Sequence, residues 1–191
     1  MKQKILQKFN LSDDKIVSIY PFGSRVYGTF SESSDYDYWV ICKSNAYNHL
    51  FAEKRENISI HLYDEITFIE FLNQSKMPAL ECIYLPKELL LKYTKAFKFK
   101  LDIDKLRLYV ADKVGRDIQQ AKLRYEANVL CMARKALFHG IRVADFSEQI
   151  IKHGKIVNYS SVSHIWKELS QDSTFEAFNS YLKKYEHFIK K

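Results

Sequence analysis

The segment PFGSRVYGTFSESSDYDYWVI, residues 21–41, decides the fold of this chain. It links two apolar runs, KIVSIYPF (15–22) and YDYWVIC (36–42), through a polar stretch. The β-branched and aromatic residues of both runs predict buried strands. Gly23 and Ser24 end the first strand, and a short helical turn begins there. The segment therefore predicts two neighbouring strands with a turn and a polar loop between them.

The sequence on either side of this segment adds further elements to the front half. In NISIHLY (57–63) the apolar residues Ile58, Ile60 and Leu62 alternate with more polar ones, which predicts a half-buried strand. Helices are expected at 2–9, near Leu50 and Phe51, at 64–72, and around Pro78 and Pro86.

The second half carries helix periodicity from about Ile103 onward and no strand pattern. We expect two helices within 102–143, followed by shorter amphipathic stretches at 145–153, 161–170 and 174–189. Strands first and helices after predict an α+β domain followed by a helical bundle. We place these domains at 1–98 and 99–191, with the boundary in KAFKFKLD.

The composition favours a well-folded protein with phosphate-bearing partners. The formal net charge of +7 raises the local concentration of nucleotides or RNA, although lysine-rich surfaces also arise without such a partner. The three cysteines are far apart in apolar runs and suggest neither disulfides nor zinc. No run approaches the roughly 18 apolar residues that span a membrane, and no signal peptide is evident, so we expect a cytoplasmic protein.

Two aspartates in the decisive segment have the spacing of a metal site. Asp35 and Asp37 lie two residues apart at the start of a predicted strand, so both side chains point to the same face. Two carboxylates at such a short separation repel one another unless a cation lies between them. Oxygen ligands of this kind suit Mg²⁺ together with substrate phosphates, and Gly23-Ser24 at the neighbouring strand end suits phosphate. The alternative is a polar turn running onto a solvated strand face.

This segment resembles the signature of polymerase-beta-type nucleotidyltransferases: Gly-Ser after an apolar strand, then Asp-x-Asp among apolar residues. It is most similar to a bacterial and phage group of predicted nucleotidyltransferases. The resemblance implies a mixed sheet with helices, followed by a helical domain that closes over a nucleoside triphosphate such as ATP. It also implies that Gly23 and Ser24 contact the phosphates, that Asp35 and Asp37 bind Mg²⁺ or Mn²⁺, and that Arg25 assists with phosphate charge.

The resemblance has a gap at the third carboxylate, which the family usually supplies from the middle of a later strand. In ISIHLY the candidate positions hold Ser59 and His61 instead. His61 could act as a neutral general base in catalysis, because its unperturbed pKa is about 6.5. Alternatively, Asp64 could reach in from the strand end, or the site binds nucleotide without efficient transfer.

A basic cluster in the second half is a second candidate for phosphate binding. Lys135, His139 and Arg142 are spaced i+4 and i+3, which places them on one face of a predicted helix. If the helical domain closes over the nucleotide, as the resemblance implies, this face could meet the triphosphate. The alternative is a solvated helix flank.

The predicted function is metal-dependent transfer of a nucleoside monophosphate from a nucleoside triphosphate to a hydroxyl group. The acceptor could be a protein side chain, an RNA end or a small molecule, and the sequence does not choose among them. Two other functions stay open: a nucleotide- or RNA-binding protein without turnover, and a partner-regulated component of a toxin–antitoxin pair.

Overall fold

The computed structural model divides the chain into two compact units, Met1–Asp102 and Ile103–Lys191. The described residues are 1–47, 51–171, 178–181 and 183. Among these residues, no helix combines the length and the apolar character needed to cross a membrane.

The first unit is built on a five-stranded sheet with the order β3-β4-β2-β1-β5. The strands are β1 (Ile16–Phe22), β2 (Tyr36–Cys42), β3 (Phe51–Arg55), β4 (Ile58–Asp64) and β5 (Lys92–Tyr93). β2 and β4 run parallel and the other neighbours run antiparallel, so the sheet is mixed. The expected α+β fold with a mixed sheet is confirmed. The strands predicted at 15–22, 36–42 and 57–63 are also confirmed, with ends that differ by at most one residue.

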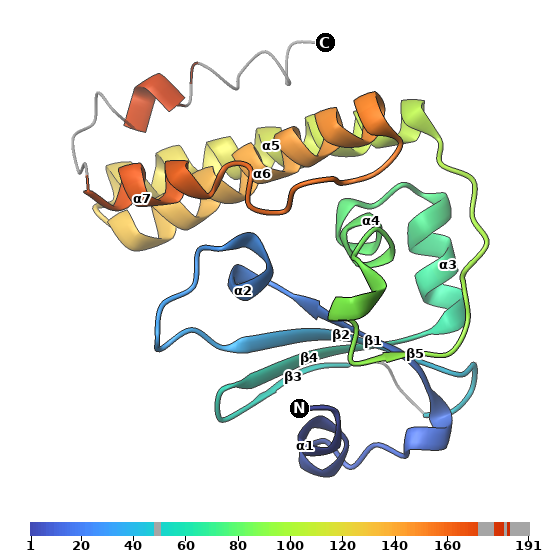
Figure 1. Ribbon diagram of the computed structural model, residues 1–191. Coiled ribbons are helices and arrows are strands. Elements are labelled where there is room, and N and C mark those ends of the chain that lie inside the picture. The colour runs from blue at the N-terminus through green and yellow to red at the C-terminus, as the bar shows by residue number, and fades with distance from the viewer. Residues whose placement is uncertain (48–50, 172–177, 182, 184–191) are drawn as a thin grey trace. The chain divides into compact units, whose positions relative to one another are not determined.

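Helices cover both faces of this sheet (Figure 1). They are α1 (Lys2–Lys8), α2 (Ser24–Tyr27), α3 (Glu65–Asn73) and α4 (Met77–Ile83), with short 3-10 turns at Asp13–Lys15 and Lys87–Leu89. α1 lies on one side of the sheet, and α3 and α4 lie on the other. Ile5, Leu6 and Phe9 from the α1 segment join the buried cluster on their side of the sheet.

The alternation of side chains along β2 explains why the two faces differ. Tyr38 and Val40 point into the buried cluster between the sheet and α1. Asp37 and Trp39 alternate with them and therefore point to the opposite face. There the ring centroid of Trp39 lies 6.3 Å from that of Phe68 in α3. The face that carries Asp37 is thus the face that α3 partly covers.

The expectation of a short helix near Leu50 and Phe51 is wrong, because Phe51 begins the edge strand β3. Leu50 itself lies outside the described residues. The sequence of β3, FAEKR, contains good helix formers, but its pairing with β4 outweighs that local preference. A two-residue connection makes the hairpin tight, and Glu56 in it has a φ of 53°.

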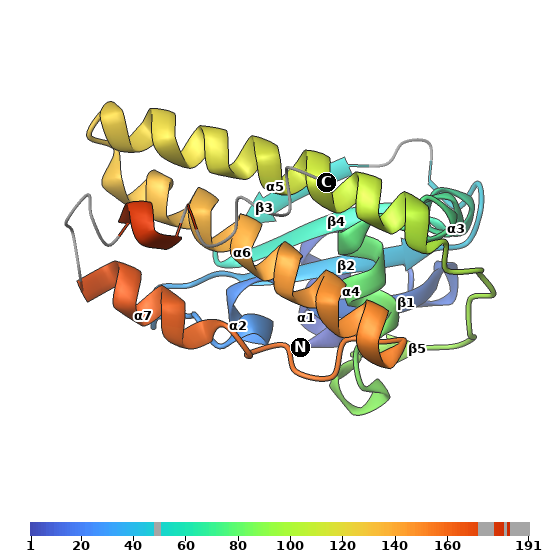
Figure 2. The same ribbon diagram turned by 90° about the horizontal axis from the view of Figure 1, so that it is seen from above.

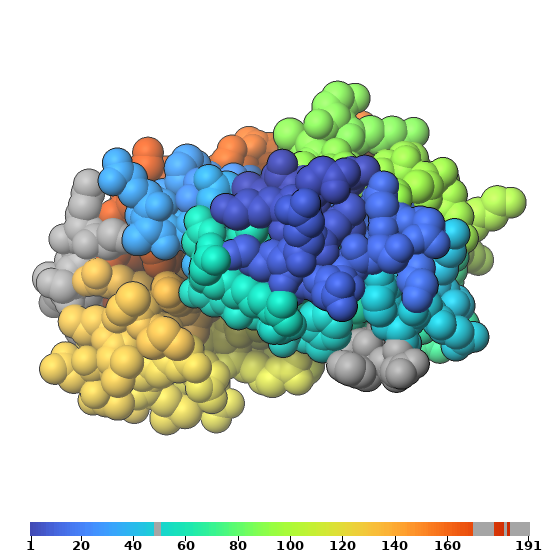
Figure 3. All heavy atoms as spheres, turned by 90° about the horizontal axis from the view of Figure 1, so that it is seen from below, coloured from blue at the N-terminus to red at the C-terminus, as the bar shows by residue number. Residues whose placement is uncertain are grey.

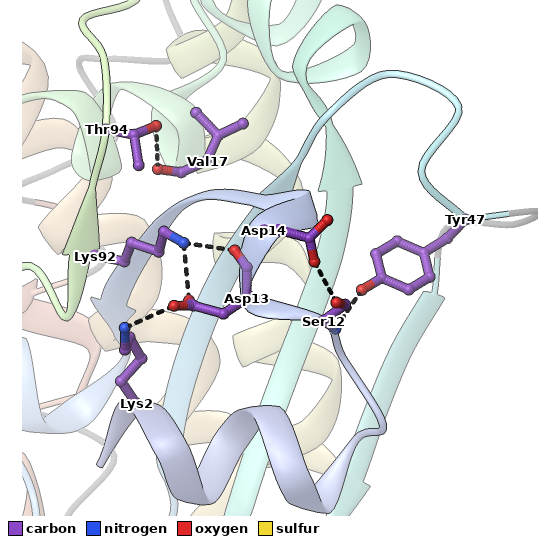
Figure 4. Close-up of polar contacts among 8 residues, drawn as sticks. All are labelled: Lys2, Ser12, Asp13, Asp14, Val17, Tyr47, Lys92 and Thr94. Carbon is purple, nitrogen blue, oxygen red and sulfur yellow. Dashed lines mark hydrogen bonds and ion pairs between the residues drawn. The ribbon is translucent and has the colours of Figure 1, made fainter.

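The N-terminal segment is tied to the sheet by the carboxylate of Asp13 (Figure 4). Asp13 accepts hydrogen bonds from Lys2 of α1 at 3.0 Å and from Lys92 of β5 at 2.8 Å. These two lysines lower the pKa of Asp13 below its usual value. In the space-filling view the dark-blue N-terminal residues lie against the turquoise residues of the β3–β4 hairpin (Figure 3). This agrees with the ion pair between Lys8 and Glu56.

The second unit is built on two long helices that lie side by side (Figure 2). They are α5 (Ile103–Glu126) and α6 (Leu130–His153), and α7 (Ser163–Gln171) follows. The buried cluster that joins them includes Ala121, Ala133, Leu137, Ile141, Val162 and Ile165. The expected pair of helices is confirmed, and the stretch at 145–153 forms the end of α6. α7 matches the stretch at 161–170, whereas most of 174–189 lies outside the described residues.

Candidate active site

The site begins at Gly23, whose backbone conformation leaves room for a carboxylate. Gly23 has a φ of +82°, and a Cβ placed there would lie 2.3 Å from Oδ2 of Asp37. The pairing of Phe22 with Asp37 across β1 and β2 brings the two positions together. Any side chain at position 23 would therefore collide with Asp37, in a φ region that favours glycine. The contact with Asp37 therefore gives a structural reason for glycine at this position, in addition to the phosphate contact that the resemblance implies.

The carboxylate pair is short of positive charge. β2 begins at Tyr36, so Asp35 lies one residue before the strand and Asp37 within it. Burial and the neighbouring Asp35 carboxylate raise the pKa of Asp37, although His61, Ser59 and Lys54 act in the opposite direction. A cation placed between the two aspartates would relieve this repulsion.

β4 places Ser59 and His61 beside the pair. In the parallel ladder, Asp37 lies opposite Ser59, and Trp39 lies opposite His61. The Ser59 hydroxyl hydrogen-bonds the Asp37 carboxylate. Burial lowers the pKa of His61, an effect that the charge of Asp37 opposes. The lowered pKa favours the neutral imidazole of His61, the form that can accept a proton.

Lys54 of β3 is a site residue that the sequence analysis missed. It lies opposite Ser59 in the β3–β4 ladder, and its Nζ is 2.6 Å from Oδ2 of Asp35. The sequence offered no signal for this contact, because residues near Phe51 were expected to be helical. Only the sheet pairing brings the ammonium group to the aspartates.

The hypothesis that Asp64 completes the site is wrong. Asp64 lies opposite Cys42 at the far end of β4, five residues from Ser59 or roughly 17 Å along the strand. Its carboxylate caps α3 by accepting a hydrogen bond from the backbone N–H of Thr67 at 2.8 Å. The other nearby carboxylates also have partners elsewhere: Glu56 pairs with Lys8, and Glu65 pairs with Lys95.

Arg25 braces the loop that precedes the aspartates. Its Nη2 donates to the carbonyl of Ser34 at 2.8 Å, and its Nε donates to the carbonyl of Asp35 at 3.2 Å. The guanidinium also lies 3.9 Å from the ring centroid of Tyr36. These contacts fix the backbone on either side of Asp35. A phosphate contact by Arg25 stays a prediction.

Residues 3–96 match the protein family described as polymerase beta, nucleotidyltransferase. This part of the chain is a polymerase-beta-type nucleotidyltransferase domain. The whole chain also shares its fold with a spectinomycin adenyltransferase from Enterococcus faecialis, whose crystal structure contains ATP and spectinomycin. The two are 12% identical with a TM-score of 0.51, and the match covers 100% of this chain and 97% of the adenyltransferase.

A second solved structure is a nucleotidyltransferase-like protein from Exiguobacterium sibiricum, also 12% identical. That match covers 99% of this chain and 73% of the other, at a TM-score of 0.39, which is too low to support an argument about the fold. No curated protein matches the sequence.

The residues of the nucleotidyltransferase domain fit a divalent metal only in part. Asp35 and Asp37 supply carboxylate oxygens, the ligands that Mg²⁺ and Mn²⁺ favour. Among the described residues, no group of three or more His, Cys, Asp and Glu side chains is arranged to hold a metal ion. Water molecules and substrate phosphates would therefore have to supply the remaining ligands, as is common at Mg²⁺ sites.

The predicted basic face of the helical unit is not one exposed surface. Lys135 is exposed, whereas Arg142 is only 2% exposed and lies over the ring of Phe146. His139 Nδ1 lies 2.6 Å from Oδ2 of Asp117 in α5, a partner that the sequence analysis also missed. A helix buries one side against its neighbour, so residues spaced i+4 and i+3 can differ in exposure.

Proposed function

We propose that this protein is a metal-dependent nucleotidyltransferase that transfers a nucleoside monophosphate to a hydroxyl acceptor. The observation that carries the proposal is the Asp35–Asp37 pair, in which Asp37 lies against Gly23 and Lys54 balances only one of the two carboxylates. The match of residues 3–96 to a nucleotidyltransferase family supports it. Lys54 neutralises one carboxylate of the pair, so one negative charge remains that an incoming cation could balance.

Different residues of the domain have different roles in the proposed reaction. Asp35 and Asp37 would hold the divalent ion, and Gly23 and Ser24 would position the triphosphate. The bound ion supplies positive charge where negative charge develops on the phosphates. The acceptor hydroxyl attacks the α-phosphorus, and the bond to pyrophosphate breaks. In this proposal the neutral imidazole of His61 takes the proton that the hydroxyl loses.

The acceptor stays open between a protein, an RNA end and a small molecule. ATP is the first nucleotide to test, because the adenyltransferase of similar fold was crystallised with ATP. The phosphate contacts predicted for Lys135, His139 and Arg142 belong to the same proposal. Lys135 is the exposed member of the three, so Lys135→Glu is the variant that tests them by its effect on nucleotide affinity.

The first experiment incubates the full chain with each α-³²P-labelled nucleoside triphosphate, Mg²⁺ or Mn²⁺, and a lysate that supplies protein and RNA acceptors. Label in one acceptor class is expected, and it should disappear in the Asp35→Ala/Asp37→Ala variant. Glu32→Ala is the matched control, because it removes an exposed carboxylate from the same loop. Label that persists in the double variant would contradict the proposal.

One observation favours a second function, a nucleotide-binding protein without turnover. Ser59 lies opposite Asp37 and is one of the two candidate positions, with His61, for the third carboxylate that the resemblance implies. Calorimetry distinguishes the two functions: this alternative gives saturable nucleotide binding and no transfer with either metal. Ser59→Asp should then restore transfer, because it returns a carboxylate to the ladder position beside Asp37.

A further inference from the structure

Lys54 places a positive charge beside the aspartates of the nucleotidyltransferase domain. We propose, on the basis of the proposed function, that this site binds one divalent ion and that Lys54 supplies its second positive charge. The ammonium group would pair with Asp35 in the nucleotide-free protein and with a phosphate oxygen once a nucleotide is bound.

The sheet aligns the groups that this proposal needs. Lys54 lies opposite Ser59, and Ser59 lies opposite Asp37, so the three side chains form a row on one face of the sheet. Ser59 in the middle of the row has a short, uncharged side chain. It leaves space for the longer Lys54 side chain to reach Asp35, 2.6 Å away.

Charge balance favours a single ion. Asp35 and Asp37 bring two negative charges and Lys54 brings one positive charge, which leaves the protein groups one negative charge in excess. Binding of one divalent ion changes the net charge of these groups from negative to slightly positive, which suits a phosphate. A second ion would have to bind without a third carboxylate, and among the described residues no such three-ligand group exists.

The ion pair is accessible enough to exchange partners. The Lys54 side chain is 56% exposed and that of Asp35 is 32% exposed. Surface ion pairs at this level of exposure contribute little to stability, because water already screens both charges. Lys54 can therefore leave Asp35 at small cost when a phosphate group arrives. A lysine suits this exchange, since its ammonium is a point charge on a long flexible stem.

This role predicts effects of opposite sign for one substitution. In the nucleotide-free protein Lys54 competes with a metal ion for Asp35, so Lys54→Met should strengthen metal binding. In the complex Lys54 attracts the phosphates, so Lys54→Met should weaken nucleotide binding. A lysine that merely solubilises the edge strand would produce neither effect.

The experiment titrates the full chain with Mn²⁺, followed by electron paramagnetic resonance, with and without α,β-methylene-ATP. Wild type is expected to bind one Mn²⁺ per chain in both conditions. Lys54→Met should bind Mn²⁺ about fivefold more tightly without nucleotide and should bind the ATP analogue about tenfold more weakly, as expected for the loss of one charge at short range. Lys54→Arg retains the charge and should stay within about twofold of wild type.

Lys98→Met is the matched control, because it removes an exposed lysine elsewhere in the same unit. Circular dichroism establishes that each variant is folded. Two Mn²⁺ ions per wild-type chain in the presence of the analogue would overturn the single-ion proposal. Equal behaviour of Lys54→Met and Lys98→Met would overturn the role of Lys54. If wild type binds Mn²⁺ but no nucleotide, the proposed function fails, while the Mn²⁺ titration still reports on Lys54.

Discussion

Two regions of the molecule gather an aspartate, a lysine and a histidine, and they differ in how these groups are paired. They are Asp37, Lys54 and His61 in the nucleotidyltransferase domain, and Asp117, Lys113 and His139 in the helical unit. Asp117 is hydrogen-bonded to both Lys113 and His139. Asp37 has a serine as its hydrogen-bonding partner, and its region's lysine pairs with Asp35 instead.

The pKa values of the two aspartates move in opposite directions. Burial and Asp35 raise the pKa of Asp37. Burial also acts to raise the pKa of Asp117, but the hydrogen bonds and charges of His139 and Lys113 outweigh it and lower that pKa. The same residue types thus make a neutralised cluster in one place and a charge-deficient one in the other. How the charged groups are paired, and not which residue types are present, therefore separates a structural cluster from a site prepared for a cation.

The largest expected effect comes from Asp37→Asn, which should remove function without removing stability. Nucleotidyl transfer should fall by about a thousandfold, because the proposed metal ion would lose one of its two carboxylate ligands. A raised folded pKa means that Asp37 stabilises the fold when protonated and that this contribution is lost as pH rises through its folded pKa. At pH 7 the neutral amide should therefore leave the free energy of unfolding unchanged or higher. Transfer assays and urea unfolding measure the two quantities. A large loss of stability would contradict the conclusion that the charge of Asp37 does not stabilise the fold.

The glycines behind the two aspartates provide the next test. Gly23→Ala should lower the free energy of unfolding by about 3 kcal/mol, because the new methyl group meets Asp37 in a φ region unfavourable to alanine. Gly140→Ala should change it by less than about 1 kcal/mol. There the Cβ would lie 3.2 Å from Cβ of Asp117, and the gain in helix propensity offsets the crowding. Urea denaturation measures both variants, and equal losses would show that Asp37 does not crowd Gly23.

Asp117→Asn should show the reverse of Asp37→Asn, a loss of stability. We expect the free energy of unfolding to fall by about 2 kcal/mol, because Lys113 and His139 lose the charge that both contact. Asp112→Asn is the matched control on the same helix, since its ion pair with Arg116 is exposed and should contribute less than about 0.5 kcal/mol. Chemical denaturation compares the two. If their effects are equal, the cluster is not a stabilising one.

The smallest expected effect is a pH dependence in the helical unit. Burial lowers the pKa of His139, helped by Arg142 and Lys113 and opposed by Asp117, so the folded state favours the neutral imidazole. Stability should therefore be fully present above about pH 6.5 and decline as pH falls below it, where the unfolded histidine takes up a proton. His139→Gln should flatten this decline between pH 7 and 5, measured as the melting temperature. His164→Gln changes an exposed histidine in the same unit and should leave the decline in place.

Much of the fold was predictable because its strands are marked by local patterns. β1, β2 and β4 each combine apolar alternation or a continuous apolar run with a clear turn at one end. β3 was missed because its residues favour a helix in isolation and its strand conformation depends on pairing with β4. An edge strand of this kind lacks the apolar pattern on which sequence-based prediction depends.

The sequence by itself determined the aspartate pair, the glycine behind it and the elements that carry them, because these residues lie within one short segment. Only the tertiary structure decided which partners reach them. Lys54 of β3 forms an ion pair with Asp35, and His139 of α6 contacts Asp117 of α5. The physical reason is that a charge acts on any group brought close to it, however distant in the chain. Sequence patterns report local geometry, whereas the pKa of a carboxylate depends on neighbours that only folding assembles.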